Sequence, residues 1–381
     1  MLSDLLLNEN VVNAYIDANL LLFVIFILWW VARFILSGMG LVGAYGAQLR
    51  LLNGIMLAGA LCPLLIYLAG GVLSQYTFNF SDIIVAHYLD GDFKIRPSTM
   101  QLLIDAPSHF VRDFVGQSGT FMVCLALTIA VGSVGFLLKA IVNLLALRRA
   151  LQACHPLRTI GSVTFLVSDT VLVPYSTRGL RRRYIVLPAV MLDNMADVRM
   201  AISHELQHFR QHDVEWDMAL AFLQSLFFWN PAFYLLRKNI GRLREMACDQ
   251  SLITRRRYDI RAYCECLLRA GRRSMMVGNP VSTMHMSVAL VEIDALRPDI
   301  SASMLRLRIL ALIGYDGRTD SSRLIYLLFM VPLITFVMIS AVMMRSPADW
   351  SHDRLMLSTI VNLERLETRN SNNLMIVRPQ R

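Results

Sequence analysis

Four long apolar stretches constrain this chain most, because each is long enough to cross the hydrocarbon core of a membrane as a helix. A spanning helix needs about 20 mostly apolar residues. The stretches lie at about residues 20–36, 51–73, 121–147 and 324–344. Only 17% of all residues are charged, whereas soluble domains have about 25%. The sequence therefore predicts an α-helical membrane protein with four transmembrane helices and excludes an ordinary soluble globule.

The basic residues predict how the chain is oriented in the membrane. No Lys or Arg precedes the first apolar stretch, whereas residues 148–323 carry 25 basic and 16 acidic residues. Positively charged loops stay on the cytoplasmic side of a membrane. We therefore expect residues 148–323 to lie in the cytoplasm, and both the N-terminus and the C-terminus to lie outside.

The apolar stretches also predict the domain organisation. We expect an N-terminal membrane region with three spans, a cytoplasmic domain, a fourth span and a short extracytoplasmic tail. These parts cover residues 1–147 (with an extracytoplasmic loop at 74–120), 148–323, 324–344 and 345–381. Within the cytoplasmic domain, residues 162–174 and 184–188 are rich in β-branched residues, which is typical of strands. The pattern turns helical from Asp193 onward, so this domain is expected to be α+β.

The strongest chemical signal is the pentapeptide HELQH, which begins at His204. On a helix, residues i and i+4 share one face, so His204 and His208 can bind one ion. Zinc in catalytic sites needs a third protein ligand and an open position for water. Glu205 projects about 100° round the helix from His204, which places it near the open position as a candidate general base.

Two carboxylates downstream can complete such a site. Glu245 follows His208 by 37 residues and is four residues before Asp249, so both fall on one helix face. One of them can be the third zinc ligand, and the other can accept the second N–H of a ligand histidine. Asp213 is a further candidate for that outer role. The six cysteines, including Cys248, form no CxxC pair and are interpreted as ordinary thiols.

These motifs carry a family resemblance. The segments PYSTRGLRRRYIVLP, SHELQHFRQHD and FFWNPAFYLLRKNIGRLREMACDQSLI, in this order with the apolar stretches, resemble the BlaR/MecR-type integral-membrane zinc metallopeptidases, a family of beta-lactam-sensing antirepressor receptors. The resemblance implies a gluzincin-like zinc metallopeptidase domain inserted between spans three and four, in a bacterial cytoplasmic (inner) membrane. It implies Zn²⁺ ligands at His204, His208 and Glu245, and the general base at Glu205.

The chain departs from those receptors at its C-terminal end. They carry a large penicillin-binding sensor domain there, whereas only 37 residues follow residue 344 and no Ser is followed three residues later by Lys. Direct binding of beta-lactams is therefore not expected. The expected partners are the lipid bilayer and a protein substrate, by analogy a transcriptional repressor. A homo-oligomer is one option, and direct contact with nucleic acid is not expected.

Some structural alternatives stay open at the level of sequence. Residues 218–236 are apolar, and they form either a helical hairpin at the membrane or a core helix of the protease domain. A fifth span is excluded, because it would place Glu245 about 30 Å from the histidines. An extended substrate is expected to pair with the strand around residues 184–187. The group that assists at the carbonyl oxygen is unassigned, with Tyr258, Tyr263 and His285 as candidates by residue type.

Three functions compete. The first is a zinc endopeptidase that cleaves a regulatory protein in signal transduction. The second is a membrane-protein quality-control metalloprotease, which uses the same motifs. The third is a signalling receptor that kept the fold without catalysis. The presence of His204, Glu205, His208 and Glu245 together argues against the third.

Overall fold

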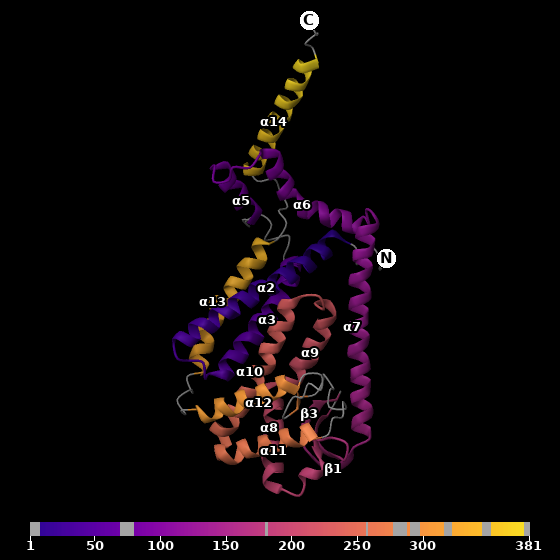
Figure 1. Ribbon diagram of the computed structural model, residues 1–381, viewed down its shortest axis with the longest axis vertical. Helices are drawn as coiled ribbons and strands as arrows, with labels where there is room; N and C mark the ends of the chain where they lie inside the picture. Colours follow the sequence, from indigo (N-terminus) through magenta and orange to yellow (C-terminus); the bar gives the residue numbers. More distant parts are fainter. Residues whose placement is uncertain are drawn as a thin grey trace. The chain divides into compact units, whose positions relative to one another are not determined.

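The computed structural model describes most of the chain as helices (Figure 1). The described residues are 8–68, 80–179, 182–256, 258–276, 288–289, 298–315, 322–344 and 352–376. His285, one of the candidate electrophiles, lies outside them. The N-terminal helices are α2 (Glu9–Gly38), α3 (Tyr45–Leu68), α5 (Phe80–Leu89), α6 (Pro97–Val115) and α7 (Thr120–Gln152). The remaining helices are the 3-10 helix η1 (Ala189–Met191), α8 (Met195–Gln211), α9 (Asp213–Leu226), α10 (Pro231–Arg256), α11 (Ile260–Met276), α12 (Pro298–Ile313), α13 (Ser322–Met343) and α14 (His352–Ile376).

Two helices are long and apolar enough to cross a membrane among the described residues, namely α2 and α7. Helices α3 and α13 occupy the other two predicted spans, but residues 69–73 of the second span lie outside the described part. Within α13, Leu328–Met343 forms a shorter apolar helix. The apolar composition of α2 and α7 indicates a membrane protein, and the predicted loop 74–120 contains two helices of its own, α5 and α6.

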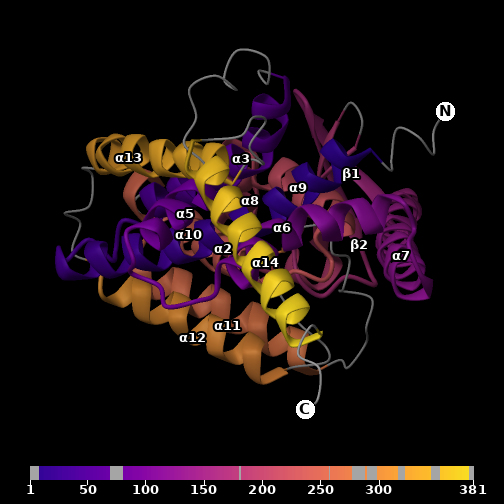
Figure 2. The same cartoon turned by 90° about the horizontal axis from the view of Figure 1, so that it is seen from above.

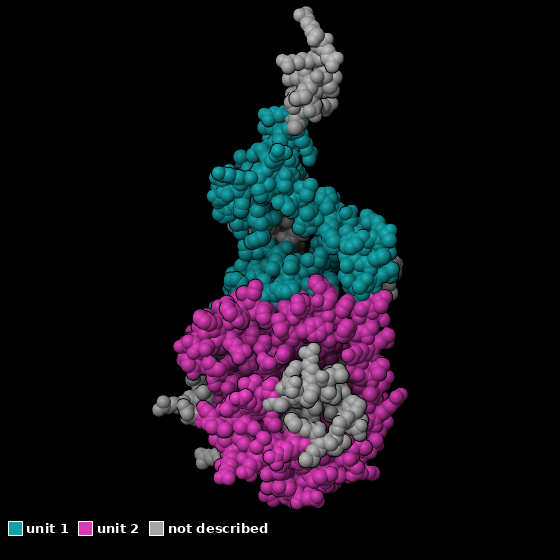
Figure 3. All heavy atoms as spheres, in the orientation of Figure 1, with its two compact units in different colours: residues 1–25, 55–129, 332–381 teal, residues 26–54, 130–331 magenta. Residues whose placement is uncertain are grey.

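The chain divides into two compact units (Figure 3). One unit contains residues 1–25, 55–129 and 332–381, and the other contains residues 26–54 and 130–331. In the first unit, α5, α6 and α14 pack together through a small apolar cluster that includes Val85, Met100 and Val361. The second unit contains the sheet and every candidate site residue that the structure describes.

The sheet of the second unit has five strands in the order β1-β2-β4-β3-β5. The strands are β1 (His155–Ile160), β2 (Val163–Ser168), β3 (Tyr175–Arg178), β4 (Arg183–Pro188) and β5 (Val288–Ala289). Strands β2 and β4 are parallel, and the other pairs are antiparallel. The predicted strand at 162–174 is therefore shorter, because it ends at Ser168 and a loop follows.

The prediction that a substrate pairs with residues 184–187 is wrong. These residues belong to β4, which lies between β2 and β3 and pairs with both. Its backbone groups are already used in the sheet, and Ile185 to Pro188 are all buried, as is typical of a central strand. Strand β3 lies nearer the edge and pairs on its outer side with β5, through Tyr175 and Ser176.

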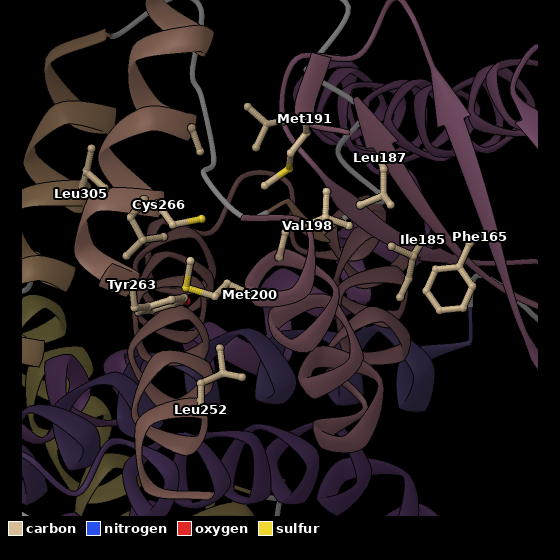
Figure 4. Packing of buried hydrophobic residues seen from close by; sticks show 14 of the residues in the cluster. Phe165, Ile185, Leu187, Met191, Val198, Met200, Leu252, Tyr263, Cys266 and Leu305 are labelled. Carbon is tan, nitrogen blue, oxygen red and sulfur yellow. The ribbon is translucent and has the colours of Figure 1, made fainter. Parts of the chain in front are cut away.

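The main core of the second unit lies between the sheet and helices α8, α10, α11 and α12. Figure 4 shows Phe165, Ile185 and Leu187 of the sheet in one cluster with Tyr263 and Cys266 of α11. Helices α11 and α12 lie side by side, as Figure 2 also shows. This core places one face of α8 against the neighbouring helices, where its histidines meet residues of α10.

The apolar stretch at 218–236 is not a single helix. Helix α9 ends at Leu226, and α10 begins at Pro231. Proline is favoured in the first helical turn, where its missing N–H is not needed. The Asn230 side chain accepts a 3.0 Å hydrogen bond from the Ala232 N–H, so the Asn-Pro pair starts a helix. The structure therefore has a helical hairpin here, and its turn exposes Leu226 and Trp229 by about half (49% and 50%).

Candidate functional site

Helix α8 carries the HELQH motif and has clear signals at both ends. The Asn194 side chain accepts hydrogen bonds from the Ala196 and Asp197 N–H groups at 3.1 and 3.4 Å, so it caps the first turn. The helix ends at His212, whose φ of 59° is left-handed. This turn starts α9 in a new direction and brings Asp213 back toward His208.

Replacing Asn194 with alanine is expected to destabilise the second unit by about 0.5–2 kcal/mol, because two helix N–H groups lose their acceptor. The unfolding midpoint in denaturant, measured on the purified chain in detergent, checks this. Asp193→Ala is the control, since Asp193 is exposed and lies just before the cap. Equal midpoints for the two variants would contradict the capping role.

The two histidines of α8 converge as the sequence predicted. His204 and His208 are fully buried, and their rings are nearly perpendicular at 87°. Their Nε2 atoms are 3.1 Å apart. Two tetrahedral zinc ligands with bonds of about 2.0–2.1 Å lie roughly 3.3 Å apart. The separation of the two nitrogens therefore suits a shared ion.

Helix α10 brings Glu245 to the same two nitrogens. Its Oε2 lies 3.5 Å from His204 Nε2, and its Oε1 lies 3.8 Å from His208 Nε2. Burial alone would raise the pKa of Glu245, but Arg308 and the two imidazoles outweigh burial and hold the pKa below its ordinary value. Glu245 is therefore ionised at neutral pH, as a metal-binding carboxylate must be.

Each histidine has a carboxylate at its other ring nitrogen. His208 Nδ1 lies 2.8 Å from Asp213 Oδ2, and His204 Nδ1 lies 3.3 Å from Asp249 Oδ1. Tyr263 donates its hydroxyl proton to Asp249 Oδ1 at 2.7 Å. Since that proton is used, His204 Nδ1 is the donor in its 2.9 Å contact with Tyr263 Oη. Both Nδ1 atoms thus carry protons, which leaves the two facing Nε2 atoms as the ring positions that can hold a further proton or a metal ion.

The protons on the two Nδ1 atoms allow a check of whether these residues fit a metal ion. The two Nε2 atoms are 3.1 Å apart, so a proton or a metal ion must lie between them. Burial lowers the pKa of His208, but Cys248, Asp213 and Glu245 outweigh it and raise the pKa to about 10. A site that attracts protons this strongly has surplus negative charge, so the donor set fits a divalent cation.

The charges around the histidines support the same conclusion. Asp249 is paired with Arg308, whose Nε lies 2.7 Å from Oδ2. Asp213 has Arg244 at 3.9 Å. Both cations are shared, because Arg308 also lies 3.0 Å from Glu245 Oε2 and Arg244 lies 3.5 Å from Asp217. The carboxylates around the histidines therefore outnumber the guanidiniums, which leaves negative charge to balance a divalent ion.

Glu205 lies one residue after His204 and is fully buried. Neither of its carboxylate oxygens makes a well-formed hydrogen bond to the described residues. Burial raises its pKa to about 7, although both histidines and the nearby Ser176 hydroxyl lower it. A carboxylate with a pKa near neutral pH can accept and return a proton.

Cys248 belongs to this cluster, which the interpretation as an ordinary thiol did not anticipate. His204, His208 and Cys248 each offer one ligand atom within 4.8 Å of the others. The sulfur lies 3.5 Å from His204 Nδ1 and donates to the His204 carbonyl oxygen at 3.4 Å. The sequence signal that could have indicated this position is the spacing, because Cys248 follows Glu245 by three residues, about one helical turn.

The two described candidate tyrosines, Tyr258 and Tyr263, use their hydroxyl groups in contacts within the fold. The Tyr263 hydroxyl contacts Asp249 and the Nδ1 of His204, not its Nε2. The Tyr258 hydroxyl contacts Ser203 Oγ at 2.9 Å. Both tyrosines therefore have structural contacts in this fold.

Comparisons with known proteins agree with this geometry. The family model described as BlaR1 peptidase M56 matches residues 117–293. The chain is 31% identical over 77 residues to the methicillin resistance mecR1 proteins of Staphylococcus aureus and Staphylococcus epidermidis. That alignment covers 20% of this chain and only 13% of the length of those relatives.

The matched region contains α8 and α10, which carry the buried candidate metal group His204, His208 and Cys248. These findings define the class of this region as a peptidase-family domain with a candidate metal site. Within this class, the family model and the mecR1 relatives support the BlaR/MecR-type family for the matched part of the chain. The resemblance stated from the motifs is thereby confirmed.

Proposed function

We propose that this chain is a membrane-embedded zinc endopeptidase that cleaves a cytoplasmic or membrane-associated regulatory protein in signal transduction. Its domain is gluzincin-like. Four helices cross a bacterial cytoplasmic membrane, with both termini outside and the protease domain inside. The apolar turn between α9 and α10, which exposes Trp229, rests against the inner leaflet.

The observation that carries this proposal is the convergence of His204, His208 and Glu245. The Nε2 atoms of the histidines are 3.1 Å apart, and one oxygen of Glu245 lies within 4 Å of each. All three residues are buried. The fully buried Glu205 beside them has no well-formed hydrogen bond to the described residues.

Glu245 fits the role of third ligand better than Cys248 does. Glu245 approaches both Nε2 atoms, at 3.5 and 3.8 Å, whereas the sulfur contacts Nδ1 of His204. That nitrogen is already engaged by Tyr263 and Asp249. Cys248 also interacts with His208, so it lies beside both histidines and is the competing candidate for the third ligand.

In the proposed reaction, Glu205 accepts a proton from the attacking water and then gives it to the leaving amine. When bound, zinc supplies Lewis acidity, which acidifies water and polarises a carbonyl. Asp213 and Asp249 fix the rings of His208 and His204 so that both Nε2 atoms face the reaction. Burial of Glu205 keeps its pKa high enough to return the proton at neutral pH.

The substrate that best fits the relationship is a transcriptional repressor. The relatives are named for methicillin resistance, and the family consists of signal transducers. We propose that this chain receives its signal without binding a beta-lactam directly, and that it contacts protein and lipid but no nucleic acid. A homo-oligomer is compatible with this role.

Substrate trapping tests the proposed function. A Glu205→Gln chain is expected to hold an intact substrate, which mass spectrometry identifies after mild crosslinking in cells. The same protein should appear as fragments only in cells with the wild-type chain. A captured transcriptional regulator supports the proposal, whereas a broad set of damaged membrane proteins favours quality control. Identical fragment patterns with wild type and Glu205→Gln would reject a protease.

A further inference from the structure

One buried charge in the second unit was not anticipated from the sequence. Arg308 lies on α12, 59 positions after Asp249 and beyond the residues that match the family model. Its side chain is only 3% exposed. A buried guanidinium costs several kcal/mol unless its N–H groups and its charge are matched, so its partners define what it does.

The guanidinium joins two carboxylates of α10. Its Nε and Nη2 atoms donate to Asp249 Oδ2 and Oδ1, each at 2.7 Å. Its Nη1 lies 3.0 Å from Glu245 Oε2. Parallel bonds of this kind fix direction as well as distance, because both groups are planar. Lysine cannot reproduce them, since its ammonium is a single point of charge.

These contacts involve one residue that is proposed to bind the ion, Glu245, and one that lies behind a proposed ligand, Asp249. Asp249, held by Arg308, is also the group behind the His204 imidazole and the acceptor for Tyr263. Glu245 presents its other oxygen, Oε1, toward His208 Nε2 at 3.8 Å. One cation from α12 therefore orients Asp249 through two hydrogen bonds and holds Glu245 as an ion pair.

The charge of Arg308 is also needed where it lies. Glu245 and Asp249 are both buried, and two like charges one helical turn apart repel each other strongly in a medium of low polarity. Arg308 contacts both carboxylates, so its positive charge offsets this repulsion.

We propose that Arg308 is a positioning residue for this metal site. By bridging Glu245 and Asp249 it holds the third ligand and the His204 imidazole in the arrangement that binds the ion. Metal affinity therefore depends on how α12 packs against α10. The inference rests on the proposed function only in taking Glu245 as a ligand.

The test measures metal binding by the purified full-length chain in detergent after treatment with a chelator. Zinc affinity comes from competition with a chromophoric chelator, and the geometry of the site comes from the visible spectrum of the Co²⁺-loaded protein. The variants are Arg308→Gln and Arg308→Lys. Arg306→Gln is the matched control, because Arg306 is exposed on the same helix.

Arg308→Gln is expected to lower zinc affinity by about 10–100-fold, the usual effect of losing a group behind a metal ligand, and to shift the Co²⁺ bands. Arg308→Lys should recover part of the affinity, because it restores charge, but not the wild-type spectrum. Arg306→Gln should match the wild type in both measurements.

Wild-type affinity and spectrum in both Arg308 variants would overturn the inference. If Arg308→Gln does not fold, the folded Arg308→Lys chain decides in the same way. If neither folds while Arg306→Gln does, Arg308 is a structural residue and the positioning role is wrong. Absence of metal from the wild-type chain would overturn this inference and the proposed function together. Tight wild-type binding without peptidase activity would remove only the proposed cleavage.

Discussion

Replacing Glu205 with glutamine is expected to abolish peptide cleavage while one metal ion per chain stays bound. Glutamine has almost the same shape as glutamate but cannot accept the proton of the attacking water. Loss of a general base costs about 100- to 10,000-fold in rate. Glu205 lies beside His204 but is not one of the three proposed ligands, His204, His208 and Glu245, which converge without it.

The measurement pairs the cleavage rate of the trapped substrate with metal content by elemental analysis. Glu265→Gln serves as the control, since Glu265 is half exposed on α11 and its ion pairs among the described residues are with arginines of its own helix. It should cleave at the wild-type rate. Cleavage by Glu205→Gln within tenfold of wild type would contradict the assignment of the base, and loss of its metal would contradict the ligand set.

Replacing Asp249 with asparagine is expected to cause the largest loss of stability. Burial alone would raise the pKa of Asp249, but Arg308 and His204 outweigh it and hold the pKa below its usual range. Asparagine would leave the buried Arg308 with Glu245 as its one remaining carboxylate in this cluster. Breaking a buried pair from one side costs about 3–5 kcal/mol, which corresponds to a fall in Tm of roughly 6–20 °C.

The Tm is measured on chelator-treated protein, so that altered metal binding does not contribute. Asp193→Asn is the matched control, because Asp193 is exposed, and it should leave the Tm unchanged. A Tm for Asp249→Asn equal to that of the control would mean that the Arg308 pair contributes nothing to folding.

Helix periodicity explains which pairs of site residues could be predicted from the sequence. Residues four positions apart share a face in any helix. This applies to His204 with His208 and to Glu245 with Asp249. Their meeting across α8 and α10 required a family resemblance, because spacing alone does not say which helices pack. Asp213 faces His208 only because His212 adopts a left-handed turn.

Other features depend on long-range packing and could not be predicted. Arg308 is one of many arginines in the chain, and nothing local marks it as the buried one. The order of the strands also depends on contacts between residues far apart in the sequence. The sequence therefore predicts edge pairing at residues 184–187, whereas the structure has this strand in the interior of the sheet. The apolar run at 218–236 divides into two helices, and Glu245 lies 3.5 Å from His204 rather than about 30 Å away, as a fifth span would require.

X-ray absorption at the zinc edge of the purified wild-type chain tests the central claim most directly. It measures the atoms bound to the ion, and zinc–sulfur bonds of about 2.3 Å are distinct from zinc–nitrogen and zinc–oxygen bonds of about 2.0–2.2 Å. We predict one zinc per chain with two imidazoles, light-atom ligands only and no sulfur. A sulfur shell, which would assign Cys248 in place of Glu245, or a chain that retains no zinc would contradict the account.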